Sequence, residues 1–145
     1  MRALVQRVAR ASVIVEGEVV GAIGPGLCVL IGVTHTDTLA TAVKLASKLW
    51  HLRLMADADG IMNLSVADTT QAVLVVSQFT LYGDTSGGRR PSWTAAARPE
   101  QAEPIVSALI DTLRNLGATV ATGRFRTEMA VELVNDGPAT VMVEM

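Results

Sequence analysis

The pattern of apolar and polar positions predicts a chain dominated by short β-strands. Val, Ile and Leu recur through residues 3–15, and a Glu-Gly pair then leads into a second β-favouring run at 18–24, which together predict a hairpin. The stretch "GPGLCVLIGV" at 24–33 predicts a buried strand that a Gly-Pro-Gly turn opens. A further buried strand is expected at 72–80, "AVLVVSQFT", and a short strand "HLRLM" leads into a turn at 57–60.

Two stretches follow helical spacing instead. Apolar residues recur every three or four positions and predict a helix over residues 37–52. A second apolar series predicts another helix, which Gly117 caps at its C-terminal end. This helix begins either at Pro99, in which case Pro104 disturbs it, or near Pro104, where a first helical turn accepts a proline.

The chain closes with three predicted strands near 118–122, 128–134 and 139–144, and "NDGPAT" separates the last two. Gly and Pro both favour turns, so this segment is either a hairpin turn or a segment whose backbone itself has a functional role. A length of 145 residues fits one domain, 1–145. The order of elements predicts an α+β fold, in which two helices pack on a layered, mainly antiparallel sheet.

Composition narrows the class of protein. Hydrophobic residues make up 50% of the chain and the mean hydropathy is +0.38, yet no apolar run approaches the roughly 18 residues that a membrane span requires. The surplus of apolar residues favours a large core together with a buried subunit interface. A formal charge of −2 argues against a protein held to nucleic acid by its overall field, so any such site is local.

The chain has a single cysteine, Cys28, which we interpret as a buried small hydrophobe rather than a nucleophile. One unpaired cysteine is compatible with a reducing compartment. The opening "MRALVQRVARAS" resembles a mitochondrial presequence in its arginines and lack of acids, but the strand pattern continues through it without a break. We therefore expect a cytoplasmic protein without membrane association.

Conventional catalytic groups are sparse. His35 lies in a polar turn and His51 follows the first helix, which are positions typical of surface residues. The sequence has no His/Cys cluster with metal spacing, no G-x-S-x-G elbow and no Walker loop, so no metal or cofactor is expected. In "SQFT", by contrast, a buried strand ends in polar residues, where Ser77 and Thr80 offer hydroxyl groups and Gln78 offers an amide.

The Gly-Pro pair of the last segment is a second candidate site. An X–Pro bond is the common place for a cis peptide. A cis bond between Gly137 and Pro138 would turn two consecutive carbonyl groups to one side, as a pair of acceptors with no side chain in the way.

Four segments together, "SQFTLYGD", "RRPSW", "GRF…M" and "LVNDGPAT", resemble the D-aminoacyl-tRNA deacylases, and the resemblance extends over the whole chain. It implies a hydrolase that removes D-amino acids from tRNA, and also glycine mischarged on tRNA(Ala). Members of this family are homodimers with the active site at the subunit interface. The resemblance implies that Gly137-Pro138 of one protomer is held cis and enters the pocket of the other, where its backbone rejects L-amino acids.

For the mechanism, we expect the backbone N–H groups of Phe79 and Thr80 to stabilise the developing oxyanion while a water molecule attacks, helped by the neighbouring ribose hydroxyl. The carbonyl groups of Gly137 and Pro138 accept hydrogen bonds from the α-ammonium group, and an L side chain then runs into this backbone. The alternative is that Thr80 acts as a covalent nucleophile, although no histidine lies near it in the sequence.

Further residues have supporting roles in this hypothesis. The Gly-Pro loop is expected to be oriented by Arg7 and braced by Asn135 and Thr140. The terminal adenosine and the tRNA phosphates are expected to contact six residues: Phe125, Met129, Arg89, Arg90, Lys44 and Lys48. Core packing is the alternative for the first two, and ordinary surface charge for the other four. The alternative function is a non-catalytic dimeric module that binds RNA 3′ ends.

Overall fold

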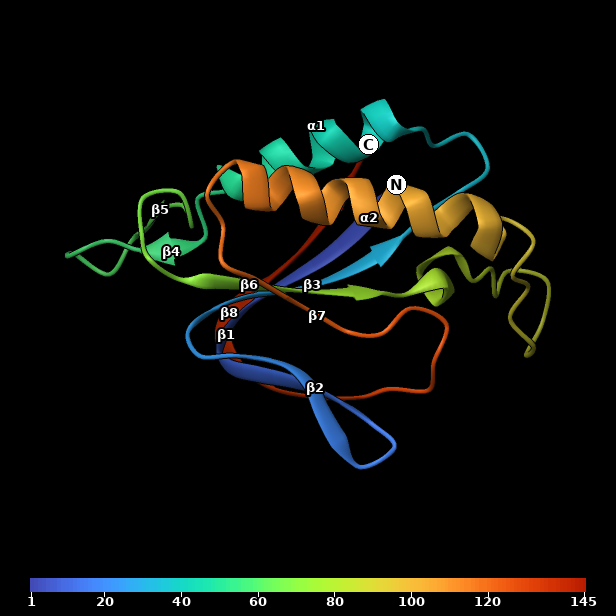
Figure 1. Cartoon of the computed structure of the whole chain (residues 1–145), viewed down its shortest axis with the longest axis horizontal. Coiled ribbons are helices and arrows are strands. Elements are labelled where there is room, and N and C mark those ends of the chain that lie inside the picture. The colour runs from blue at the N-terminus through green and yellow to red at the C-terminus, as the bar shows by residue number, and fades with distance from the viewer.

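A six-stranded sheet forms the centre of the computed structural model, which describes residues 1–145 (Figure 1). Its longest strands, β1 (Arg2–Val15) and β8 (Ala130–Glu144), pair antiparallel along most of their length. The other edge of β1 is shared, because its first half pairs with β3 (Gly26–Gly32) and its second half with β2 (Glu18–Ile23). The hairpin predicted between β1 and β2 is confirmed.

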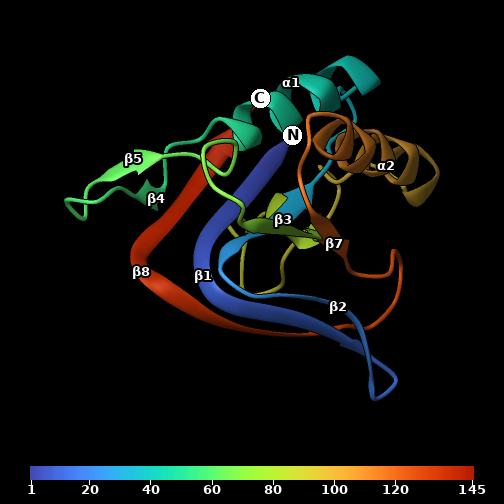
Figure 2. The ribbon, with the colours of Figure 1, turned by 60° about the vertical axis from the view of Figure 1, so that its left-hand side comes forward.

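The sheet curls into a nearly barrel-like shape. Figure 2 shows the strong bend that β1 and β8 share. On the other side, β3 pairs with β6 (Ala72–Ser77) and β6 with β7 (Val120–Thr122). β2 returns toward β7, and a Cβ atom added at Gly21 would lie only 2.2 Å from the carbonyl oxygen of Thr122. Position 21 therefore requires glycine, because two backbones approach there.

The two helices connect parallel strands. α1 (Leu39–Trp50) lies between β3 and β6 in the chain, and α2 (Pro99–Asn115) lies between β6 and β7. Both strand pairs are parallel, as expected for strands joined by a helical crossover. The sheet is therefore mixed: three of its five strand pairs are antiparallel, which agrees with the prediction of a mainly antiparallel sheet, and the two parallel pairs were not predicted. The prediction of two helices packed on a sheet is confirmed.

Local sequence accounts for the start of α1 and for both ends of α2. Thr38 caps α1, and its side chain exchanges hydrogen bonds with Thr41 in a capping box. α2 begins at Pro99 and continues through Pro104, whose exposed ring removes one backbone donor without ending the helix. Gly117, with φ +107°, follows its last turn as predicted.

Two strand predictions need correction near the middle of the chain. β6 ends at Ser77, not at residue 80, because the next residues turn into a 3-10 helix, η1 (Phe79–Tyr82). The expected strand "HLRLM" is reduced to β4 (Met55–Ala56). It pairs across the predicted 57–60 turn with β5 (Met62–Leu64), a strand that its few apolar residues did not indicate.

The strands predicted at 128–134 and 139–144 are a single strand, β8. Across from it on β1, Gln6 pairs with Thr140 and Val8 pairs with Asn135. Four residues of β8, 136–139, therefore stand opposite Arg7 alone. The segment "NDGPAT" is thus an enlarged bulge inside a continuous strand and not a hairpin turn.

Both helices cover one face of the sheet (Figure 1), and the larger core cluster lies between the helices and this face. A smaller cluster, which includes Cys28, lies on the other face. Burial raises the pKa of the Cys28 thiol to about 11, which agrees with a packing role. None of the helices is both long enough and apolar enough to cross a membrane.

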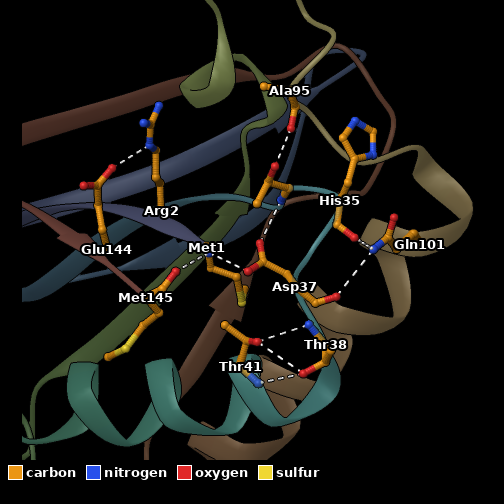
Figure 3. Close-up of polar contacts among 11 residues, drawn as sticks. Met1, Arg2, His35, Asp37, Thr38, Thr41, Ala95, Gln101, Glu144 and Met145 are labelled. Carbon is orange, nitrogen blue, oxygen red and sulfur yellow. Dashed lines mark hydrogen bonds and ion pairs between the residues drawn. The ribbon is translucent and has the colours of Figure 1, made fainter.

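A polar network ties the start of the chain to the loop before α1 (Figure 3). The ammonium group of Met1 is buried and lies 2.7 Å from Oδ1 of Asp37. Oδ2 of Asp37 accepts a hydrogen bond from the backbone N–H of Thr34 at 2.8 Å. From α2, the Gln101 amide donates to the carbonyl oxygens of His35 and Asp37. The network fixes the start of α2, which borders the candidate site.

Candidate active site

A pocket of about 490 Å³ opens where β6 ends, a volume typical of small-molecule sites. Four segments line it: the end of β3, the end of β6 with the start of η1, the start of α2 with the residue Ala97 before it, and the loop between β7 and β8 with the start of β8. Of the residues predicted for the site, five line the pocket: Ser77, Gln78, Phe79, Phe125 and Met129. The fold thus brings together two segments that lie far apart in the sequence.

The end of β6 leaves two backbone donors without a partner. The N–H of Gln78 still follows the sheet and donates to the carbonyl oxygen of Ile31 at 2.7 Å. The hydrogen bonds of η1 begin with the N–H of Leu81, which donates to Gln78 at 3.2 Å. Between these bonds, the N–H groups of Phe79 and Thr80 have no acceptor within the protomer, as expected for the first residues of a helical turn.

Arg2 holds the η1 turn in place. Its Nη1 atom donates to the carbonyl oxygen of Leu81 at 2.9 Å, and its guanidinium group lies 4.6 Å from the centre of the Tyr82 ring. The Gln78 amide also donates a hydrogen bond to Oγ1 of Thr80. The two free N–H groups therefore belong to a fixed turn.

The loop between β7 and β8 supplies the other wall of the pocket. A Cβ atom added at Gly123 would lie 2.7 Å from the Met129 sulfur, so this glycine makes room for the methionine. Arg126 adopts a left-handed backbone with φ 58° and also lines the pocket. Sequence reasoning missed Arg126, and it missed Ala97 and Pro99 at the start of α2, because small or isolated residues give no periodic signal.

The Gly137-Pro138 segment lies outside this pocket. Its peptide bond is cis, both residues are exposed, and neither lines the pocket. A Cβ atom added at Gly137 would meet only the Oδ1 atom of Asn135, at 3.4 Å. Within one protomer, the bulge therefore presents its backbone to the surroundings.

Arg7 holds one side of the bulge. Its Nε atom donates to the carbonyl oxygen of Asp136 at 3.1 Å and lies 3.0 Å from the Asp136 carboxylate. Its Nη1 atom donates to the carbonyl oxygen of Leu54 at 2.8 Å. The guanidinium group thus links the bulge to the segment before β4.

Asn135 spans the base of the bulge. Its Nδ2 atom donates to the carbonyl oxygen of Arg7 at 2.9 Å and to that of Ala139 at 3.3 Å. Its Oδ1 atom accepts a hydrogen bond from Thr140 at 3.4 Å. These bonds satisfy backbone groups that the bulge removes from the β1–β8 pairing.

Replacing Asn135 with alanine is expected to loosen the bulge and to lower stability by about 1 kcal/mol, since the carbonyl groups of Arg7 and Ala139 lose their donor. Amide hydrogen exchange at residues 136–139 should become faster. Asn115→Ala is the matched control, because the Asn115 side chain is exposed at the end of α2. Equal exchange in both variants would contradict the bracing role.

The predicted basic residues lie away from the pocket lining. Arg89 and Arg90 are exposed in the loop before Trp93, and Lys44 and Lys48 are exposed on α1. None of the four takes part in an ion pair.

Neither histidine reaches the end of β6. The His35 ring contacts the carbonyl oxygen of Thr94 at 2.6 Å, and the His51 ring contacts that of Ser47 at 2.9 Å. No group of three or more His, Cys, Asp or Glu side chains is arranged to hold a metal ion. Apart from the guanidinium group of Arg126, the groups at the pocket that can stabilise a negative charge are therefore the free backbone donors.

Comparison with known proteins identifies the family. The family model described as D-Tyr-tRNA(Tyr) deacylase matches residues 4–144. The chain belongs to this family. A D-aminoacyl-tRNA deacylase from Streptomyces coelicolor is 58% identical, with full coverage of both chains. A protein of the same name from Nocardia farcinica is 60% identical over 99% of each chain.

A solved structure shares this fold over the whole chain. The protein named c-Myc DNA Unwinding Element Binding Protein superimposes with a TM-score of 0.94 and is 38% identical, over 100% of this chain and 99% of that one. The family predicted from the sequence is confirmed, and with it the prediction that the chain is an enzyme of the hydrolase class.

Proposed function

We propose that the protein hydrolyses the ester bond of D-aminoacyl-tRNA and of glycyl-tRNA(Ala), releasing the free amino acid and tRNA in the cytoplasm. The observation that carries the proposal is the pair of unpartnered N–H groups at Phe79 and Thr80, beside a pocket of suitable volume in a chain of the deacylase family. The names of the relatives support the same substrate class.

The chemistry requires little beyond placement and charge stabilisation. When water attacks the ester carbonyl, negative charge develops on its oxygen, and two fixed N–H donors stabilise this charge more strongly than they stabilise the uncharged ester. The neighbouring ribose hydroxyl assists the attacking water. Phe125 and Met129 line the pocket, where the adenine ring of the substrate packs against them. Ser77 and Gln78 complete the wall on which the ester lies.

Chiral selection is assigned to the backbone of Gly137 and Pro138, supplied by a second copy of the chain in a homodimer. Both residues are exposed and absent from the pocket of their own protomer, which supports a role in a neighbouring one. Their carbonyl groups accept hydrogen bonds from the α-ammonium group. With ammonium and ester fixed, an L side chain runs into this backbone, a D side chain points outward, and glycine has no side chain to exclude.

Thr80→Ala is expected to slow deacylation by less than about 10³-fold, because the hydroxyl group has no neighbouring base to make it a nucleophile. Thr80→Ser keeps the hydroxyl group and is the control. Single-turnover rates are measured for both variants. A larger loss in Thr80→Ala, together with an acyl-enzyme trapped in the wild type, would establish the covalent route instead.

The experiment that tests the proposed function compares matched D-Tyr-tRNA and L-Tyr-tRNA at substoichiometric enzyme. Rapid release of D-tyrosine alone, with turnover, supports both the reaction and the chiral selection. Equal release of both amino acids would refute selection by the backbone. Release of neither would favour the alternative, a non-catalytic dimer that binds RNA 3′ ends.

A further inference from the structure

Two aromatic side chains are exposed, and in contact with each other, at the mouth of the pocket. Of the five aromatic residues of the chain (two Phe, two Trp and one Tyr), Phe79 is 54% exposed and Trp93 is 42% exposed. Their ring centres lie 5.5 Å apart at an interplanar angle of 71°. Phe79 lines the pocket and Trp93 does not, so the pair extends the apolar surface from the pocket outward.

The Trp93 ring is exposed but held in place. A Cβ atom added at Gly83 would lie 2.5 Å from the Trp93 ring, so the indole lies directly against this stretch of backbone. Asp84 and Ser92 exchange two backbone hydrogen bonds of 2.8 Å each, which fixes the residue just before Trp93. An aromatic surface that is ordered before a ligand arrives loses little conformational entropy on binding.

The same segment carries positive charge. The loop that the Asp84–Ser92 bonds close contains Arg89 and Arg90, both exposed and without an ion-pair partner. Cationic side chains beside exposed aromatic rings are the chemistry that recognises single-stranded nucleic acid, in which bases stack on the rings and phosphates contact the cations.

We propose that Phe79 and Trp93 form a stacking platform for the unpaired nucleotide that precedes the terminal adenosine of tRNA, and that Arg89 and Arg90 contact the adjoining phosphates. This inference rests on the proposed function, in which the pocket holds the aminoacylated adenosine. The preceding nucleotide then leaves the pocket over the Phe79 edge and reaches Trp93. Because every base has an aromatic face, the platform adds affinity for the strand without reading its sequence.

A kinetic comparison tests the platform against a merely structural role. KM is measured for D-tyrosyl-tRNA and for D-tyrosyl-adenosine, which lacks the preceding nucleotides. Trp93→Ala is expected to raise the first KM about tenfold relative to the second, the size of one lost stacking contact, and Trp93→Phe is expected to restore most of this ratio. An equal rise in both KM values would overturn the platform, since Trp93 would then only support the pocket.

A binding measurement tests the platform independently of catalysis. In a Trp50→Phe variant, Trp93 is the sole tryptophan, and its fluorescence is titrated with the trinucleotide CpCpA and with adenosine monophosphate. Quenching by the trinucleotide alone is expected, and its absence would overturn the platform even in an active enzyme. Quenching by the trinucleotide without any hydrolysis of D-Tyr-tRNA would support the stacking platform and refute the proposed deacylase activity. Dissociation of dimers in Trp93→Ala would also overturn it, because Trp93 would belong to a subunit contact.

Discussion

Phe79→Pro is expected to slow deacylation by about 10²–10³-fold relative to Phe79→Ala, the loss typical of one missing oxyanion donor. Both variants lose the phenyl ring, but only proline also removes the backbone N–H. Proline fits the first position of a helical turn, and the N–H of Phe79 bonds to nothing within the protomer, so the substitution breaks no hydrogen bond of the fold. Gln78, with φ −144° and ψ 80°, lies outside the α region that a following proline disfavours.

The measurement is the single-turnover rate with D-Tyr-tRNA, accompanied by the melting temperature of each variant. Similar melting temperatures with a large difference in rate would assign catalysis to the N–H group itself. Equal rates for the two variants would show that the N–H group of Phe79 has no role in catalysis, and the N–H group of Thr80 would remain as the oxyanion donor.

Two defective variants are expected to restore activity when they are combined in one dimer. Phe79→Pro damages the pocket, and Gly137→Val places a side chain on the bulge, where its Cβ atom meets only the Oδ1 atom of Asn135, at 3.4 Å. In the proposed dimer, each variant alone has two damaged sites. In a heterodimer of the two, both changes fall in one site and the other site is intact, so about half of the wild-type activity returns.

The control is a heterodimer of the wild type with the double variant Phe79→Pro/Gly137→Val. If the site is shared between subunits, each of its two sites contains one damaged part, and this heterodimer is inactive. If each protomer has a complete site, the wild-type protomer retains about half of the activity and the first heterodimer stays inactive. Each heterodimer is isolated after co-expression of its two chains with different affinity tags. A shared site and a site within each protomer predict opposite results for the two heterodimers, so the measurement distinguishes them.

The elements with a strong repeating pattern were predicted well from the sequence. The hairpin around Glu16-Gly17 followed from its turn residues, and the first helix from apolar spacing. The parallel strand pairs were missed, because pairing depends on which strands a helix connects and local patterns do not contain this information. The predicted strand at 72–80 was longer than β6, because Phe79 and Thr80 both favour strands although their backbone turns into η1.

The candidate site was predictable mainly through family motifs. A strand that ends in polar residues is a weak signal by itself, and the free N–H groups at Phe79 and Thr80 became apparent only from the hydrogen bonds. Phe125 and Met129 were predicted at the site only through the family resemblance, because a loop and not a repeating pattern brings them to the pocket that Gln78 also lines. The bulge was mistaken for a turn, because Gly-Pro pairs favour turns, whereas the pairing of β1 continues on both sides of it.

The continuity of β8 through its bulge limits which insertions and deletions the chain tolerates. Beyond the bulge, Val141 and Val143 pack against the core while Met142 faces outward. Side chains alternate along a strand, so losing or gaining one residue at 136–138 would exchange these faces if the bulge kept its length, because every later residue would then shift by one position along β1. Val141 and Val143 would then enter solvent and Met142 the core. The length of this segment is therefore constrained by folding as well as by any ligand that it contacts.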